Sequence, residues 1–405
     1  MRDRILVTGV GAVSAAGMSV EENVGTLSAG RRPLHTPELL KTSLKLPVGE
    51  VMADSRELLS ILGLHKDKVV TRTALLAALA VSEAVRDAGL GANALQGGRT
   101  GLILGTSAGG MDLSEIFYEE AGRGGISGDL NRVRMHDCGA TVRFVADYIG
   151  LKGFSTAVST ACSSAGNAIM LGARMIMSGL LDTVIAGGSD PLCRFTINGF
   201  NSLRILSSDL CRPFDIARDG LNLGEGAGFI VLTHERPGME MAADGRAYCT
   251  LSGWANTDEA YHQTGSQPSG VGAYAAMSEA LSVAGLNPGD IDYINTHGTA
   301  TRGNDLAEGT AIRRLFGDRA VFGSFKGYIG HTLAASEGIE AVLCAVSIKR
   351  QAVWPSAGFS EPDPEIGISP LCPSGMQPMR IRHLVSNSFG FGGNDSSLVF
   401  SRLSS

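Results

Sequence analysis

The stretch Ala157-Val158-Ser159-Thr160-Ala161-Cys162-Ser163-Ser164-Ala165 connects a short apolar run to a long segment of small and apolar residues. The first part reads as the end of a strand, and residues 165–178 read as a helix. A cysteine between a strand end and a helix start lies in the positive field of the helix dipole, which favours the thiolate. Thiolates attack acyl groups, so the pattern predicts a nucleophile at Cys162.

A lone cysteine is more often a small buried hydrophobe than a nucleophile. Two histidine segments, residues 295–301 with His297 and residues 326–332 with His331, shift the balance toward catalysis. Cysteine and histidine together form a common pair for nucleophilic chemistry. The histidines elsewhere in the chain show no metal-ligand spacing, so we expect no metal site.

The composition predicts a large, well-packed protein. The chain has 405 residues, more than a usual single domain, so two packed halves are expected. Hydrophobic residues make up 44% of it and charged residues 18%, which leaves little material for disordered tails. The net charge of −6, without a basic block, argues against a nucleic-acid partner.

The seven cysteines are odd in number and widely spaced, without a Cys-x-x-Cys pair. This pattern indicates neither a disulfide framework nor a zinc site, and it fits a reducing compartment. The N-terminus enters a strand directly and does not resemble a signal peptide. No apolar run approaches the roughly 20 residues that span a bilayer. We therefore expect a cytoplasmic protein with no membrane partner.

Strand-like and helix-like segments alternate along the whole chain, which predicts an α/β fold with helices covering a mostly parallel sheet. Residues 82–90 (SEAVRDAGL) resemble residues 278–286 (SEALSVAGL), about half the chain away. Each copy reads as a helix that ends at a glycine and leads into a strand. Such a repeat predicts a duplication, with an N-terminal half over residues 1–235, a C-terminal half over residues 236–405 and the site between them.

Two glycine-rich segments suggest nucleotide binding at first sight. Residues 9–14 follow a strand, but Ser14 occupies the third glycine position of a dinucleotide fingerprint and no acidic residue is clearly placed for a ribose. Residues 224–228 lack the Gly-Lys-Ser/Thr ending of a phosphate loop. We expect these glycines to allow close backbone approach beside strands.

Taken together, the motifs resemble the β-ketoacyl-acyl-carrier-protein synthases of types I and II and the polyketide ketosynthases, within the thiolase superfamily. The resemblance covers essentially the whole chain and rests on Thr160-Ala161-Cys162-Ser163-Ser164, Arg212-Pro213-Phe214-Asp215, Arg218-Asp219-Gly220, Gly224-Glu225-Gly226-Ala227-Gly228, His297-Gly298-Thr299, Lys326-Gly327-Tyr328-Ile329-Gly330-His331 and Asn387-Ser388-Phe389-Gly390-Phe391-Gly392-Gly393. It implies a thiolase-like α/β fold of two duplicated βαβαβ halves, packed in α-β-α-β-α layers. It also implies decarboxylative Claisen condensation of an acyl primer with malonyl carrier protein.

The resemblance implies a role for each catalytic residue. Cys162 takes the acyl group from a carrier-protein thioester. The ring N–H groups of His297 and His331, both un-ionised, stabilise the malonyl enolate. The backbone N–H groups of Cys162 and Phe391 form the oxyanion hole for the acyl carbon. The phosphopantetheine arm arrives on the carrier protein, so no resident cofactor is expected.

The surrounding residues have implied supporting roles. Lys326 is expected to be buried and to pair with Glu308. Glu308 also lies three residues after Asp305, so a capping box is an equal alternative. Thr299 and Thr301 match positions that hydrogen-bond the pantetheine arm; as an alternative, their hydroxyls satisfy backbone groups at a strand end. Arg218 and Asp219 are expected to form a structural ion pair below the site.

Further positions are implied for substrate and partner binding. Phe200, Phe389 and Gly390 are expected to line the substrate pocket. Ala108 stands where a bulkier aliphatic residue often limits the acyl pocket, which suggests room for a wider or longer chain. Residues expected near the tunnel entrance, where an acidic carrier protein docks, are Lys66, Lys68 and Arg204; a solvated surface is the alternative for these three.

Two other departures from the fatty-acid enzymes are Asn394-Asp395 in place of the usual Thr-Asn and Ser336-Glu337 in place of a small-residue pair. The hypothesis is a specialised polyketide or polyene ketosynthase. A thiolase-type acyltransferase is disfavoured because it needs a second catalytic cysteine in a glycine-rich context. A chain-length-determining partner subunit is disfavoured because such relatives lose the nucleophile, whereas this chain retains Cys162. A homodimer and a heterodimer with such a subunit both stay open.

Overall fold

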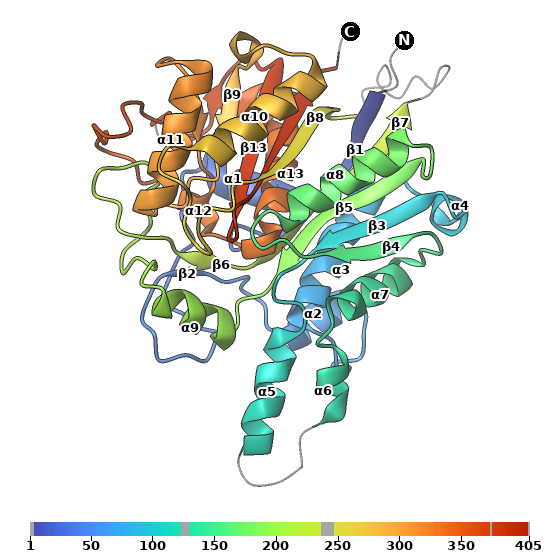
Figure 1. Ribbon diagram of the computed structural model, residues 1–405. Coiled ribbons are helices and arrows are strands. Elements are labelled where there is room, and N and C mark those ends of the chain that lie inside the picture. Colours follow the sequence, from blue (N-terminus) through green and yellow to red (C-terminus); the bar gives the residue numbers. More distant parts are fainter. Residues whose placement is uncertain (1–3, 123–128, 236–246, 373–374, 404–405) are drawn as a thin grey trace.

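The computed structural model describes residues 4–122, 129–235, 247–372 and 375–403 (Figure 1). The boundary expected between residues 235 and 236 falls at the edge of residues 236–246, which lie outside the described residues. Ten strands form one sheet in the order β10-β9-β13-β14-β8-β1-β7-β5-β3-β4. Two further pairs, β2–β6 and β11–β12, form short two-stranded sheets.

The strands are β1 (Arg4–Ser14), β2 (Val48–Gly49), β3 (Thr100–Gly105), β4 (Ser155–Val158), β5 (Thr183–Asp190), β6 (Leu223–Gly224), β7 (Gly226–Glu235), β8 (Cys249–Asp258), β9 (Tyr293–Asn295), β10 (Phe322–Gly323), β11 (Ala352–Val353), β12 (Gln377–Pro378), β13 (His383–Gly390) and β14 (Asn394–Ser401). The prediction of a mostly parallel sheet is wrong. In the large sheet, the pairs β10–β9, β9–β13, β3–β4 and β3–β5 are parallel, whereas β1–β7, β1–β8, β5–β7, β8–β14 and β13–β14 are antiparallel. Each half contains both parallel and antiparallel strand pairs, because β1 and β7, like β8 and β14, run antiparallel to their neighbours.

The sheet consists of two similar halves. The strand order β4-β3-β5-β7-β1 of the first half is matched position by position by β10-β9-β13-β14-β8 in the second. The repeated segments form the ends of α3 (Arg72–Asp87) and α10 (Val271–Ala284). Each helix is followed by a glycine with positive φ, +65° at Gly89 and +69° at Gly285, a conformation that favours glycine. The predicted duplication is therefore visible in the backbone.

The halves join at β1 and β8, where Leu6 pairs with Thr250 and Val7 with Cys249. Two central helices, α8 (Ser164–Met177) and α13 (Ser336–Arg350), each contact strands of both halves. On the outer faces, α3 packs on β1 and β7, and α10 packs on β8 and β14 (Figure 1). The layers are therefore α-β-α-β-α, the thiolase-like arrangement. The central layer is strongly buried, since 13 of the 15 residues of α13 are buried.

The remaining helices complete the fold. They are α1 (Val20–Ser28), α2 (Ser55–Ile61), α4 (Ala92–Gln96), α5 (Met111–Gly122), α6 (Leu130–Arg134), α7 (Cys138–Ile149), α9 (Arg194–Ser202), α11 (Arg302–Phe316) and α12 (Lys326–Ile329), with short 3₁₀ helices at Pro288–Asp290 and Leu333–Ala335. In Figure 1, α5 and α6 project away from the body. Among the described residues, no helix combines the length and apolar character that crossing a membrane requires.

The two glycine-rich segments serve packing. A Cβ added at Gly11 on β1 would lie 2.0 Å from the backbone oxygen of Ala80 on α3. One added at Gly228 on β7 would lie 2.1 Å from the backbone nitrogen of Ile339 on α13. Both strands therefore need glycine where a helix crosses them closely. The expected role of these glycines in close backbone approach is confirmed.

Candidate active site

Cys162 lies in a tight turn between β4 and the start of α8. Ala161 before it has φ +53°, a conformation that costs a residue with a side chain about 1 kcal/mol or more and is common at functional sites. The Oγ of Ser164 accepts a hydrogen bond from the N–H of Thr160 (2.9 Å) and donates one to the carbonyl of Ala161. Ser388 on β13 donates to the carbonyl of Cys162 (3.0 Å). The nucleophile's backbone is thus held from both halves of the molecule.

The thiol of Cys162 is buried, with 5% of the residue exposed. Burial raises its pKa to about 11, although the Lys326 ammonium and the N–H groups of Phe391 and of Cys162 itself act in the opposite direction. The expected help from the helix start is therefore outweighed in the resting site. The cause is desolvation, which the local sequence does not report.

Both predicted histidines lie beside the thiol. His331 Nε2 is 3.0 Å from Cys162 Sγ, and its Nδ1 is 2.8 Å from the Oγ of Ser336. The His297 ring stands at 88° to that of His331, with the ring centroids 5.3 Å apart. One ligand-type atom from each of the three residues lies within 4.8 Å of the other two. A sulfur and two imidazoles therefore converge on one point.

Burial lowers the pKa of both histidines well below the ordinary value, and the positive charge of Lys326 adds to the effect. Both rings are therefore neutral near neutral pH, and each has one N–H to donate. His297 Nδ1 is buried without a hydrogen-bond partner among the described residues.

Phe391 lies in the turn between β13 and β14. Its backbone N–H and that of Cys162 both hydrogen-bond the thiol sulfur. Gly392 and Gly393 follow with φ +89°, which only glycine adopts readily. Two N–H donors from different segments thus converge on the sulfur of Cys162.

Lys326 is buried and its Nζ lies 2.7 Å from Oε1 of Glu340 on α13. The predicted pairing of Lys326 with Glu308 is therefore wrong. Glu308 instead accepts hydrogen bonds from the N–H groups of His297 and Gly298, both at 2.8 Å. Burial raises the pKa of Glu308 to about 7. This carboxyl fixes the backbone that carries His297.

The capping-box interpretation of Glu308 is also wrong. Helix α11 begins at Arg302 with Thr301 as its N-cap, so Asp305 and Glu308 lie inside the helix. The expected Arg218–Asp219 pair is likewise wrong. Arg218 contacts Asp363 (2.6 Å) and lies 3.7 Å from Asp305.

A cavity of about 240 Å³ opens onto the thiol. It is lined by Cys162, Phe200, Ile205, Leu221, Glu259, Thr264, Gly265, Ser266, His297, Thr299, Thr301, Gly303, Asn304, His331, Phe389, Gly390, Phe391, Gly392 and Gly393. Most residues predicted to contact substrate are in this set. Ala108 is not; it is buried after β3, with its N–H donated to Asp190 (2.9 Å). The hydroxyls of Thr299 and Thr301 are 2.9 Å apart.

The three predicted docking residues do not gather at one place. Arg204 follows α9 and precedes Ile205, which lines the catalytic cavity. Lys68 lies over the ring of Phe144 and lines a different cavity. Lys66 is exposed between α2 and α3. Of the three, Arg204 is the one that adjoins a lining residue of the catalytic cavity in sequence.

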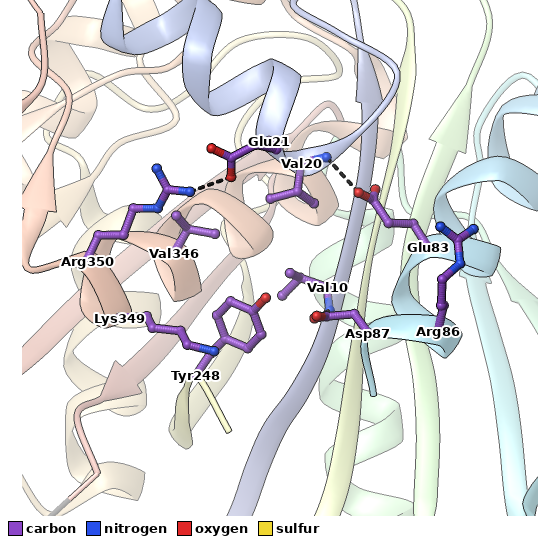
Figure 2. Close-up of a pocket in the computed structure, with 10 residues that line it drawn as sticks. All are labelled: Val10, Val20, Glu21, Glu83, Arg86, Asp87, Tyr248, Val346, Lys349 and Arg350. Atoms are coloured by element: carbon purple, nitrogen blue, oxygen red, sulfur yellow. Dashed lines mark hydrogen bonds and ion pairs between the residues drawn. The ribbon is translucent and has the colours of Figure 1, made fainter. Parts of the chain in front are cut away.

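A separate cavity of about 450 Å³ lies between α1, α3 and α13, away from the thiol (Figure 2). Its charged groups face one another: Arg350 pairs with Glu21 (2.5 Å), and Glu83 accepts the N–H of Val20 (2.9 Å). The ammonium of Lys349 lies over the Tyr248 ring, 3.9 Å from its centroid. None of Cys162, His297 and His331 lines this cavity.

Sequence reasoning noted Ser336 and Glu337 only as departures from the fatty-acid enzymes and missed Glu340; all three are buried polar residues of α13. The signal was present, because two glutamates spaced by three lie in a helix that is otherwise largely apolar. Buried carboxyls are seldom kept without a partner or a purpose.

Comparison with known proteins identifies this arrangement. Residues 2–237 match the family described as "Beta-ketoacyl synthase, N-terminal domain", and residues 248–360 match "Beta-ketoacyl synthase, C-terminal domain". The chain is 34% identical over 410 residues to "Nodulation protein E" of Rhizobium meliloti, covering 100% of both chains. It is also 34% identical over 415 residues to "3-oxoacyl-[acyl-carrier-protein] synthase 2" of Staphylococcus aureus (strain COL), covering 98% of both.

Comparison with solved structures also finds ketosynthases. "The ishigamide ketosynthase/chain length factor" superposes with a TM-score of 0.92 at 27% identity, covering 100% of both chains. A ketosynthase (ApeO) in complex with its chain length factor (ApeC) from Xenorhabdus doucetiae gives 0.84 at 32% identity, covering 99% of this chain and 98% of that one. Fold and site together define a thiolase-like condensing enzyme. The chain belongs to the β-ketoacyl synthase family, and its activity is that of a 3-oxoacyl-acyl-carrier-protein synthase, an acyltransferase.

Proposed function

We propose that Cys162 is the acyl-accepting nucleophile and that His297 and His331 stabilise the enolate of the extender unit. The observation that carries this is the 3.0 Å contact between Cys162 Sγ and His331 Nε2, in a cavity where His297 supplies a second neutral ring. Neutral imidazoles donate a hydrogen bond without repelling a nearby cation, and enolate charge is stabilised by such fixed donors.

In the first half-reaction, the Cys162 sulfur attacks the thioester of the acyl carrier, and the N–H groups of Cys162 and Phe391 hold the carbonyl oxygen as charge develops. The thiol proton leaves with the pantetheine sulfur. In the second, the malonyl thioester loses carbon dioxide, and the electron pair of the broken bond forms the new carbon–carbon bond to the acyl carbon. Cys162 then departs as the leaving group. Decarboxylation supplies the carbanion, so the site needs charge stabilisation rather than a strong base.

The geometry also supports roles around the reacting atoms. We propose that Thr299 and Thr301 hydrogen-bond the pantetheine arm, because both hydroxyls line the cavity beside His297. Phe200 stacks on Phe391 with ring centroids 5.6 Å apart and, with Phe389, forms the apolar wall. Lys326 tunes both histidines through its charge.

For the pathway, we propose a specialised polyketide or polyene ketosynthase acting on carrier-protein substrates. The support is the full-length likeness to "The ishigamide ketosynthase/chain length factor" and to the Xenorhabdus doucetiae ketosynthase in complex with its chain length factor. Ala108 does not add to this support, because it does not line the catalytic cavity. The partner is a second ketosynthase-like chain, either a copy of this one or a chain-length subunit. β4 ends the large sheet, and its outer edge is a template for pairing.

The test is intact-protein mass spectrometry of the wild type and of Cys162→Ala after incubation with a panel of acyl carrier proteins. We expect an acyl mass gain on the wild type alone, discharged by malonyl carrier protein to a product two carbons longer. A mass gain on Cys162→Ala as well would refute the nucleophile. Saturated medium-chain primers proving clearly the best substrates would refute the specialised pathway. Native mass spectrometry of the chain alone and with a candidate chain-length subunit distinguishes the two dimers.

A further inference from the structure

Ser336 is the first residue of α13 and is buried directly behind His331. The 3₁₀ helix Leu333–Ala335 turns the chain so that the Ser336 hydroxyl comes within 2.8 Å of His331 Nδ1. The opposite ring nitrogen, Nε2, faces the sulfur of Cys162 at 3.0 Å. The imidazole is therefore held between one hydroxyl and the nucleophile.

A neutral imidazole carries one proton, and the partner of one nitrogen decides where that proton lies. For His331 to donate from Nε2 toward sulfur or an enolate oxygen, Nδ1 must accept a hydrogen bond. The Ser336 hydroxyl supplies such a bond. The Thr332 hydroxyl lies 3.2 Å from the Ser336 oxygen and can donate to it in turn. With each hydroxyl donating toward the ring, the two form a chain that ends at Nδ1.

We infer that Ser336 is a positioning residue that fixes the Nε2–H tautomer of His331 and aims this donor at the reacting centre. This inference rests on the proposed roles of Cys162 and His331. The titratable groups that face the Cys162–His331 pair from the surrounding elements are His297, Lys326 and Asp190. None of them contacts Nδ1, so the tautomer depends on the hydroxyl.

The test compares Ser336→Ala with Ser347→Ala. Ser347 is a matched control, since it is a buried serine of the same helix whose hydroxyl has no partner among the described residues. The readout is the rate of Cys162 alkylation by iodoacetamide, because an Nε2–H donor stabilises the thiolate. We expect Ser336→Ala to lower this rate about tenfold at each alkaline pH, the effect of losing roughly one charge-assisted hydrogen bond. Ser347→Ala should match the wild type.

Alkylation needs no carrier protein, so it tests the role of Ser336 even if the wild type shows no condensing activity. Failure of the Ser336 inference can therefore be told apart from failure of the proposed function. Nitrogen-15 NMR of histidine-labelled wild type measures the tautomer in the unaltered protein, and His331→Asn serves only to assign the His331 signals. A protonated Nε2 and an unprotonated Nδ1 are expected. The inference is overturned if Nδ1 carries the proton in the wild type, or if both serine variants alkylate at the wild-type rate.

Discussion

Asp395, the second residue of β14, carries a buried carboxyl group. We expect its replacement by asparagine to stabilise the protein at neutral and alkaline pH. Asp395 is 3% exposed, and burial raises its pKa from 3.8 to about 8, with the carboxyls of Glu259, Glu308 and Asp258 acting in the same direction. The folded state therefore keeps a proton that the unfolded chain releases at about pH 4. Such a group stabilises the fold below its unfolded pKa and loses that contribution as the pH rises through its folded pKa.

Each pH unit between these two values costs about 1.4 kcal/mol, so the Asp395 contribution falls by about 3 kcal/mol between pH 5 and pH 7. This figure is a ceiling, because neighbouring carboxyls relax when one changes. Asparagine has the same size and stays neutral, and it fits the space where Gly272 approaches Oδ2 closely. Urea unfolding at a series of pH values, with the exposed Asp209→Asn as control, measures the difference. If Asp395→Asn is less stable than the wild type at pH 8, the carboxylate is stabilised in the fold and the reasoning fails.

Other perturbations test the central helices and the thiol. Gly166→Ala places a Cβ 1.7 Å from the Glu337 carboxyl and should cost about 1–3 kcal/mol of unfolding free energy, measured by urea unfolding. Adding Glu337→Ala should recover part of this loss. If the effects of the two substitutions are strictly additive, the two residues are not in contact. Lys326→Met leaves Glu340 buried without its cation, so the unfolding free energy should fall by about 3–5 kcal/mol. Adding Glu340→Met should restore part of this stability. If Lys326→Met alone loses no stability, the ion pair is not buried. With a Cys162 pKa of about 11, wild-type alkylation should rise about tenfold per pH unit from pH 7 to pH 10, and a plateau near neutral pH would indicate a stabilised thiolate instead.

The features that followed from sequence are those encoded locally or by repetition. The alternation of segments predicted the α/β layers, and the repeat at residues 82–90 and 278–286 predicted the duplication. The motifs around Cys162, His297 and His331 predicted a trio that the fold brings together. Phe391 was placed beside the thiol by the family resemblance, and its glycine-rich turn makes the close backbone approach feasible.

The errors concern partners and environments, which depend on how helices orient after packing. Glu308 and Glu340 lie 18 and 14 residues from Lys326 in the sequence, so distance along the chain does not decide between them. In the fold, Glu340 lies on the side of α13 that faces Lys326 and forms the ion pair. Arg218 found Asp363, 145 residues away, in place of its neighbour. The Cys162 pKa rose because both halves cover the thiol, an effect absent from a strand–turn–helix considered alone.

The seam between β1 and β8 has a consequence for biogenesis. Cys162 belongs to the N-terminal half and both histidines to the C-terminal half, while the seam itself rests on the pairs Leu6–Thr250 and Val7–Cys249. A chain that has completed its first half during synthesis holds a cysteine with no imidazole beside it. We expect such an intermediate to lack condensing activity, because Cys162, His297 and His331 come together only when the second half docks. Its thiol lacks the cover of that half, which raises the Cys162 pKa in the complete fold, so docking both completes the trio and shields the thiol.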